Sequence, residues 1–419
     1  MMQLVKVLNS PLYKNSVYLI INAAVTTSLG FFFWIVVARF YSEYQVGYGS
    51  AIVSAIALIA LFSRLGLGMA LIRFLHSTDK PVEMINSSLT LSGIISLVLV
   101  GIFIAGIDVW SPALHFIKDN AIFVTSLVLF AVFLSLSGLL ETVFIARRRA
   151  GFVLAKNTIV SLLKIPLPII LVMYFDAFGI ISSWGIAVGI ALIISLFYFL
   201  PRVQDSYIPV PQLRLNVLKG KWMYSLGNHV AMIFDVAPGF VLPLIIVNRL
   251  GAEQNAYFYI AWMIITLLFA IPDSVCRSLF AEGSHFEDEL EANARKSLKF
   301  IYLLIVPAII VLVGGGKWLL LLFGWAYSVN AYSMLWILAL SGILVSLNRV
   351  YAATLRVQGR IRELMILSGF IAAVVVLVAI FASPTIGIVG IGYGWIAAHG
   401  VVSVYVAWRM KTRRTVLAK

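Results

Sequence analysis

Long apolar runs, separated by short polar joints, follow one another along most of the chain. Each run holds about 20 residues, which is the length an α-helix needs to cross a hydrocarbon core about 30 Å thick. No stretch keeps the alternation of apolar and polar residues that transmembrane strands require. The pattern predicts an all-α polytopic membrane protein with twelve membrane-spanning helices, at residues 16–38, 47–74, 86–107, 120–145, 152–174, 178–200, 222–248, 256–281, 297–315, 329–354, 363–383 and 387–408.

The longest internal joint, residues 202–221, lies close to mid-chain and contains Pro209 and Pro211. It predicts an N-terminal six-helix bundle (residues 1–201), a cytoplasmic linker (202–221) and a C-terminal six-helix bundle (222–419). The halves also echo each other, since Arg64 late in the second span matches Arg277 late in the eighth. An even number of spans in each half makes the repeat parallel, so we expect a cavity between the halves.

Composition and charge agree with a membrane protein. Hydrophobic residues make up 62% of the chain and charged residues 11%, and the formal net charge is +14. If both termini are cytoplasmic, 23 Lys and Arg residues, Lys156 among them, fall on the cytoplasmic side and 4 on the other. We therefore expect a multi-pass protein of the cell (plasma or inner) membrane with both termini in the cytoplasm, and no nucleic-acid partner. The single Cys276 excludes an intramolecular disulfide and a cysteine-based metal site.

Four basic residues fall inside the predicted spans: Arg64, Lys164, Arg277 and Arg349. A buried arginine in a membrane helix costs roughly 2.5–3.5 kcal/mol on insertion scales, so such a residue usually faces a bundle interior or a wet cavity. Arginine forms paired hydrogen bonds with phosphate oxygens and stays charged in a dry site. The four residues are therefore candidate ligands of phosphate groups in a vestibule open to the cytoplasm.

Each of these residues also has a purely structural interpretation. Arg349 is close enough to the end of its span to extend its side chain to the interface. Arg277 follows Asp273 by four residues, a spacing that allows an ion pair within one helix. Lys164 precedes two prolines and could satisfy the carbonyls that they free. Arg64, about ten residues from the cytoplasmic end of its span, is the strongest candidate for lining the transport cavity.

Asp235 and Asp273 are the candidate ion-coupling residues. Asp235 lies mid-span just before Pro238, and a carboxylate beside a helix break is typical of a proton or sodium site. Asp235 could equally be the partner of a buried base. No catalytic residues, no metal site and no cofactor are predicted, since Ser161 and Lys164 match a Ser-x-x-Lys motif by letters only. Coupling to a proton or sodium gradient stays open.

Three segments carry a resemblance to a known family. The first segment contains the end of the first span, ARFYSEYQVGYGS, and the end of the second, SRLGLGMALIRFL. The second segment runs from Ile271-Pro272 through Glu282-Gly283-Ser284, and the third from Leu321 to Tyr327. They resemble the Wzx-type lipid-linked oligosaccharide flippases, which are polysaccharide-biosynthesis proteins of the multidrug/oligosaccharidyl-lipid/polysaccharide (MOP) exporter superfamily. Many relatives have a proline before the glutamate near the end of the eighth span, whereas this chain has Phe280-Ala281-Glu282.

The resemblance implies a MATE-like, V-shaped pair of six-helix bundles that work by alternating access. It implies export of a polyprenyl-diphosphate-linked oligosaccharide from the cytoplasmic leaflet, with membrane lipids and other glycan-assembly proteins as further partners. In related flippases, cations of the second and eighth spans bind the diphosphate, and Arg64 and Arg277 are the matching positions here.

Two other functions compete with the flippase. A proton- or sodium-coupled multidrug exporter of the same superfamily would have a cavity dominated by carboxylates and aromatic residues, whereas bases predominate in these spans. A membrane-embedded glycan polymerase or ligase would need a large external loop, and the outer joints here are short.

Overall fold

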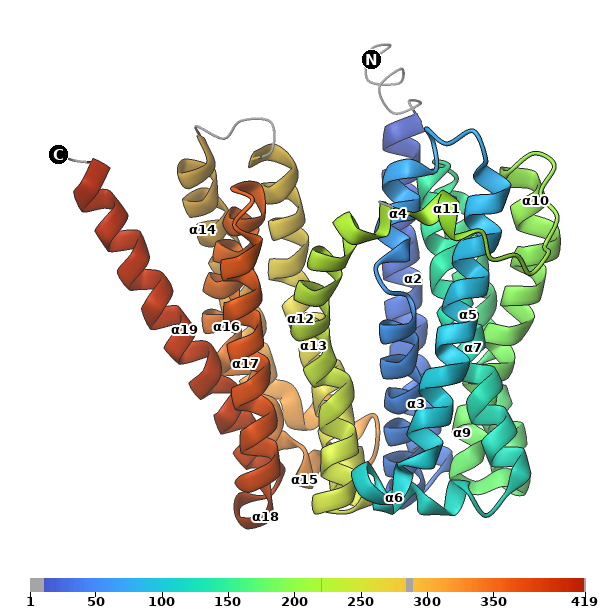
Figure 1. The fold of residues 1–419 in the computed structure, drawn as a ribbon. Coiled ribbons are helices and arrows are strands. Elements are labelled where there is room, and N and C mark those ends of the chain that lie inside the picture. Colours follow the sequence, from blue (N-terminus) through green and yellow to red (C-terminus); the bar gives the residue numbers. More distant parts are fainter. Residues whose placement is uncertain (1–10, 220, 284–288, 418–419) are drawn as a thin grey trace, which may run out of the picture. The chain divides into compact units, whose positions relative to one another are not determined.

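The computed structural model describes residues 11–219, 221–283 and 289–417, so residue 220 of the predicted linker lies outside the described residues. Across these ranges the chain is helical, without strands, and twelve helices are long and apolar enough to cross a membrane. The predicted all-α fold with twelve spans is thus confirmed. The helices fall into two compact units, Met1–His229 and Val230–Lys419, which we name the N-terminal and C-terminal units (Figure 1).

Six of the candidate spans lie in the N-terminal unit, and within it the long helices run side by side (Figure 1). Its elements are α2 (Pro11–Phe40), α3 (Glu43–Ser63), α4 (Leu67–Phe74), α5 (Pro81–Ala105), α6 (Ile107–Trp110), the 3-10 helix η1 (Pro112–Ile117), α7 (Ala121–Ala146), α8 (Ala150–Leu163), α9 (Leu167–Ile194), the π-helix η2 (Ser195–Phe199), α10 (Leu200–Val203) and α11 (Leu215–Leu218).

The C-terminal unit contains the other six candidate spans. Helix α12 (Lys221–Arg249) crosses the division between the units. It is followed by α13 (Ala252–Gly283), α14 (Leu290–Leu321), α15 (Trp325–Asn330), α16 (Tyr332–Val357), α17 (Ile361–Phe381), α18 (Ser383–Ile386) and α19 (Ile388–Leu417). Helix α16 is the central element, because α13, α14, α17 and α19 all pack against it.

Small residues let the helices of the N-terminal unit approach closely. The Ser135 hydroxyl on α7 lies 2.6 Å from the hydroxyls of both Ser63 on α3 and Ser92 on α5. Serine is common at helix interfaces in membranes, where its short side chain permits tight packing and hydrogen bonds between helices. These contacts fix α3, the helix directly before Arg64, against α7.

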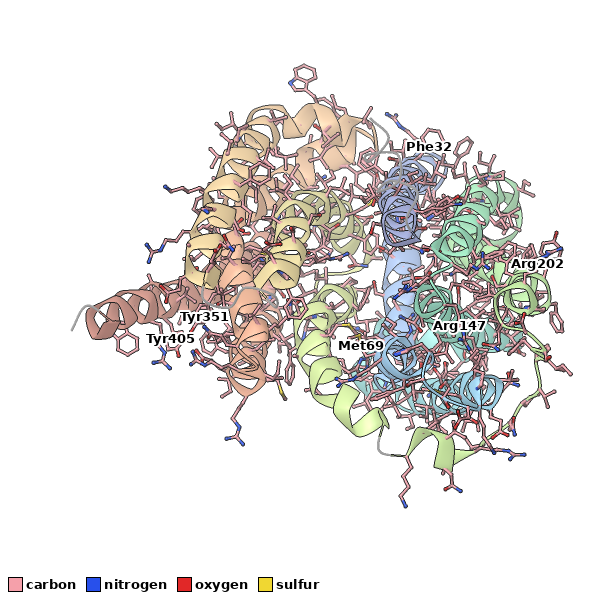
Figure 2. The ribbon with its side chains drawn as sticks, turned by 90° about the horizontal axis from the view of Figure 1, so that it is seen from above. Phe32, Met69, Arg147, Arg202, Tyr351 and Tyr405 are labelled. Carbon is pink, nitrogen blue, oxygen red and sulfur yellow. The ribbon has the colours of Figure 1, made fainter. Side chains whose placement is uncertain are left out.

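The turn between α7 and α8 is anchored to the chain that leaves the last helix of this bundle. Arg147, which Figure 2 labels, lies in that turn. It donates a hydrogen bond to Gln204, directly after α10. Farther along, the backbone N–H of Arg214 donates to Ser87 of α5 over 3.0 Å. The predicted linker is therefore held along the end of the N-terminal unit.

Candidate functional site

Arg64 lies where a predicted span breaks in two. The sequence predicts one helix over 47–74, but α3 ends at Ser63 and α4 begins at Leu67. Leu65 and Gly66 have φ angles of 44° and 75°, in the left-handed region that ends a helix. Arg64 therefore follows the carboxyl end of α3, where the helix dipole favours a positive charge.

The Arg64 side chain reaches across to α7. Its Nη2 donates to the carbonyl oxygen of Leu134 over 3.3 Å. A Cβ atom on Gly138 would lie 2.3 Å from the Arg64 Cζ, so only glycine leaves room for the guanidinium. The Nε atom is buried without a hydrogen-bond partner, and the side chain has no carboxylate within 4 Å among the described residues. Among the described residues, most donors of this guanidinium therefore have no protein partner.

A buried ion pair lies on the same face of α7. Lys156 of α8, whose side chain is 2% exposed, bonds Glu141 Oε1 over 2.8 Å and the Ser137 hydroxyl over 2.7 Å. The Glu141 carboxylate also interacts electrostatically with Arg64. We call Arg64, Glu141 and Lys156 the basic cluster; two bases and one acid give it a net charge of +1.

Sequence reasoning missed Lys156, which it placed among the cytoplasmic residues. The structure instead buries it inside α8, six residues after that helix begins, opposite Glu141 five residues before the end of α7. Glu141 and Lys156 lie at nearly equal distances along the chain from the turn between α7 and α8. Opposite charges placed in this way are the signal that could have found the pair.

Lys164 also lies at a helix break. It follows α8 at the point where the predicted span 152–174 divides, and α9 begins at Leu167 after Pro166. Its Nζ lies 5.1 Å from the centre of the Phe33 ring, an arrangement that stabilises a cation through the face of the ring. Within the described residues its ammonium group donates no hydrogen bond to a carbonyl, so the aromatic contact takes the place of that predicted partner.

In the C-terminal unit, Arg349 of α16 holds two carboxylates from two other helices. Its Nη1 bonds Asp235 of α12, and its Nε lies 3.1 Å from Asp273 Oδ1 of α13. This is the alternative in which Asp235 pairs with a buried base, and Asp273 pairs with the same arginine. The other alternative, an ion pair between Asp273 and Arg277, is not formed in the described part of the chain, and the Arg277 side chain is exposed.

A chain of neutral polar groups borders this triad. Asn348 Nδ2 donates to the His399 carbonyl oxygen over 3.0 Å, and the Ser403 hydroxyl donates to Asn348 Oδ1 over 3.1 Å. Asp235, Asn348, Arg349 and His399 line one pocket with about 460 Å³ of empty space. Sequence reasoning gave no role to Asn348 or His399.

The two units thus hold two different electrostatic sites. The basic cluster and Lys164 are positive, whereas Asp235, Arg349 and Asp273 together carry one excess negative charge. The expectation that Arg64 and Arg277 share a chamber stays a prediction, because the two residues belong to different units.

A family model described as "Polysaccharide biosynthesis protein" matches residues 36–329, which is more than half of the chain. The chain belongs to this polysaccharide biosynthesis family. Over 144 residues it is 26% identical to the Shigella flexneri protein named "Putative O-antigen transporter". That match covers 34% of this chain and 33% of the relative, so it spans about a third of the relative's length.

Two solved structures have the same fold as this chain. A multidrug resistance MATE family transporter superposes with a TM-score of 0.70 at 16% identity, covering 94% of this chain and 95% of that one. The lipid II flippase MurJ superposes with a TM-score of 0.73 at 13% identity, covering 93% and 87%. The predicted MATE-like fold is confirmed, and the chain belongs to a polysaccharide biosynthesis family, as the resemblance predicted.

Proposed function

We propose that this family member is a flippase. It moves a polyprenyl-diphosphate-linked oligosaccharide from the cytoplasmic to the outer leaflet by alternating access, for the synthesis of a surface polysaccharide or another glycan. The observation that carries the proposal is the half-buried Arg64, whose guanidinium has donors to spare in a cluster with net charge +1. A diphosphate is a matching ligand because several of its anionic oxygens can accept hydrogen bonds from one planar guanidinium group.

The predicted diphosphate ligands have different roles in this proposal. Arg64 and the exposed Arg277 bind phosphate oxygens, and Lys164 adds positive charge from its place against Phe33. Arg349 is engaged by two aspartates, so it binds phosphate only after leaving them. Asp235 and Asp273 remain the candidate sites for a coupling proton or sodium ion, which would compete with Arg349 for the same oxygens.

The proposed setting follows from the charge asymmetry. With 31 basic residues distributed mainly to one side, the chain fits a cell-membrane protein with both termini in the cytoplasm. Its partners are then the lipid-linked oligosaccharide, the surrounding lipids and the proteins that assemble the glycan.

The Arg64→Ala substitution tests the flippase proposal. We expect surface glycan to appear at least about tenfold more slowly, because a hydrogen bond to a charged group contributes roughly 1.5–3 kcal/mol. The measurement is the rate of labelled surface polysaccharide in a deletion strain that carries the variant, normalised to the amount of membrane-inserted protein.

Arg73→Ala is the matched control, since Arg73 is an exposed arginine on the adjoining α4 and should leave export unchanged. Normal export by the Arg64→Ala variant would remove Arg64 from the mechanism. If the deletion strain makes normal surface glycan but becomes sensitive to toxic organic cations, the multidrug exporter is the better description.

Gly138→Ala tests the position of the guanidinium without removing its charge. The new methyl group would overlap the Arg64 Cζ, so the flexible side chain must leave Leu134. We expect export to fall about as far as in Arg64→Ala while the melting temperature changes little. Gly93→Ala on α5 is the control, because its Cβ would meet its nearest atom at 3.8 Å. Wild-type export by Gly138→Ala would mean that the site tolerates a displaced guanidinium.

A further inference from the structure

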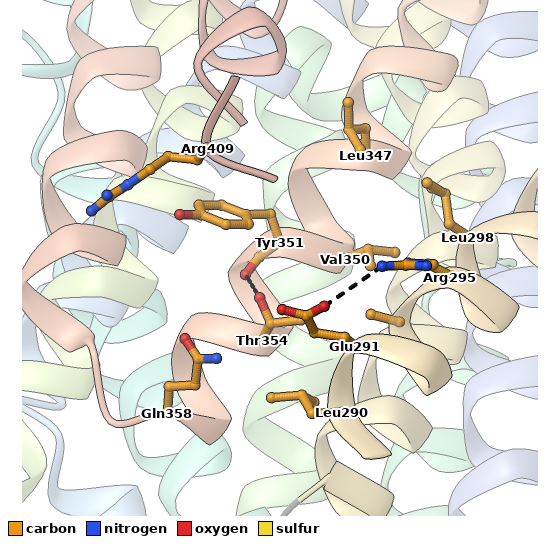
Figure 3. A pocket seen from close by; sticks show the side chains of 11 residues that line it. Leu290, Glu291, Arg295, Leu298, Leu347, Val350, Tyr351, Thr354, Gln358 and Arg409 are labelled. Atoms are coloured by element: carbon orange, nitrogen blue, oxygen red, sulfur yellow. Dashed lines mark hydrogen bonds and ion pairs between the residues drawn. The ribbon is translucent and has the colours of Figure 1, made fainter. Parts of the chain in front are cut away.

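A separate pocket lies at one end of the C-terminal unit, between α14 and α19. Helix α16 packs against both of these helices and forms its floor, and the pocket has about 680 Å³ of empty space (Figure 3). It is lined by Leu290, Glu291, Ala294, Arg295, Leu298, Leu347, Val350, Tyr351, Thr354, Gln358 and Arg409. None of the residues predicted to bind the transported diphosphate is among them.

The pocket lies at the depth of the lipid headgroups. Helix α14 has 32 residues, which at about 1.5 Å per residue makes it roughly 48 Å long. This exceeds a hydrocarbon core of about 30 Å, so the first turns of α14 reach into the headgroup region. Arg409 is the last residue of the apolar stretch of α19. Among the lining residues, Leu298 is the farthest from the start of α14, and Leu347 is the farthest from the end of α16. Both are apolar.

The charges on the pocket walls favour an anion. Arg295 comes from α14 and Arg409 from α19, and they lie on opposite sides of Tyr351 in Figure 3. Glu291 is the one acidic lining residue, 3.6 Å from Arg295 Nη2. Two arginines and one glutamate leave a net charge of +1 on the lining.

A carboxylate behind the pocket wall, Glu363, is paired with Arg360 and also interacts electrostatically with Arg409. Glu363 of α17 accepts hydrogen bonds from the hydroxyls of Tyr351 over 2.7 Å and Tyr405 over 3.1 Å (Figure 2). These bonds hold α16, α17 and α19 together at this end of the unit, so the pocket has a fixed inner wall.

We propose that this pocket binds an anionic glycerophospholipid of the surrounding membrane. One acyl chain lies against Leu298, Leu347 and Val350, and the phosphate lies between Arg295 and Arg409. The apolar wall selects an amphiphile over a free anion, and the net positive lining selects an anionic headgroup over a zwitterionic one. Bound there, the lipid bridges α14 and α19 across α16 and stabilises the C-terminal unit.

The test uses the purified full chain in detergent, titrated with dioleoyl-phosphatidylglycerol or dioleoyl-phosphatidylcholine and followed by native mass spectrometry and thermal unfolding. We expect tighter binding and a larger rise in melting temperature with phosphatidylglycerol. Each arginine near a charged membrane surface changes affinity by about fivefold, so Arg295→Gln with Arg409→Gln should weaken phosphatidylglycerol binding by roughly 25-fold. Arg362→Gln, an exposed arginine on α17 outside the lining, should leave it unchanged.

Glu291→Gln should change lipid affinity in the opposite direction. The test then does not depend only on variants that lose binding. Removing this carboxylate frees Arg295, so phosphatidylglycerol should bind more tightly than to the wild type. The proposal is overturned if both lipids bind equally, or if the arginine variants keep the wild-type preference. Equal stabilisation by glycerol 3-phosphate would overturn it too, since the pocket would then be a site for a free anion.

Discussion

Glu141→Ala is expected to unfold at a clearly lower temperature than the wild type, with a loss of about 3 kcal/mol in unfolding free energy. The reason is the ammonium group of Lys156, which is 2% exposed and loses its only carboxylate partner within 4 Å in the described chain. We take the lower end of the range for a broken buried ion pair because the Glu141 side chain is 35% exposed. The measurement is thermal unfolding in detergent across a denaturant series.

Comparing the stability losses of Glu141 and Lys156 variants tests whether the unpaired Lys156 charge causes the loss in Glu141→Ala. Lys156→Met should destabilise less than Glu141→Ala, because Glu141 keeps an electrostatic partner in Arg64. The double variant should be more stable than Glu141→Ala, since the unpaired ammonium group of Lys156 is then removed, while Arg64 lacks Glu141 in both variants. Lys299→Met, an exposed lysine on α14, is the control. If Glu141→Ala and the double variant unfold at the same temperature, the buried charge of Lys156 is not what Glu141 compensates.

Glu141→Ala also separates stability from transport. Losing the acid raises the charge of the basic cluster, and we expect the surviving folded protein to bind anions more tightly rather than less. A slower export rate in that variant would then reflect slower release of the diphosphate.

Hydropathy was sufficient to predict the spans, because crossing a membrane needs only a long enough apolar run. It could not locate breaks inside such a run. The residues around Arg64 are as apolar as a continuous helix requires, and only Gly66 hints at a left-handed backbone; Leu65, with φ of 44°, gives no such signal. The break therefore moved Arg64 from mid-helix to a helix end that the sequence did not reveal.

Charge pairs show the same limit. The spacing of Asp273 and Arg277 correctly places them one turn apart on the same face of α13, but spacing does not say which other helices pack against that face. The partner of Asp273 is Arg349, 76 positions along the chain, and the second partner of Arg349 is Asp235 on a third helix. Such a triad depends on how α12, α13 and α16 pack, which local pattern does not determine.

Arg349→Ala is expected to destabilise the C-terminal unit by about 3 kcal/mol, because it leaves two aspartates facing each other without a counter-charge. All three side chains are partly exposed, so the loss of unfolding free energy should lie at the low end of the range for broken buried ion pairs. The difference in unfolding free energy between the wild type and Arg349→Ala should shrink as the pH falls, since protonating one carboxylate removes the repulsion between the two aspartates. Asp235→Asn in the same background should restore part of the loss at neutral pH. The measurement is unfolding temperature against pH for the wild type and both variants.

Arg277→Ala is the matched control, since Arg277 lies on α13 and forms no ion pair within 4 Å among the described residues. It should leave stability unchanged and, under the proposed function, slow export. Sodium should stabilise Arg349→Ala more than the wild type, because the freed carboxylates can hold a cation where the guanidinium was. If sodium has no effect and the deficit is independent of pH, Asp235 and Asp273 are only structural partners of Arg349, and the coupling ion must bind elsewhere.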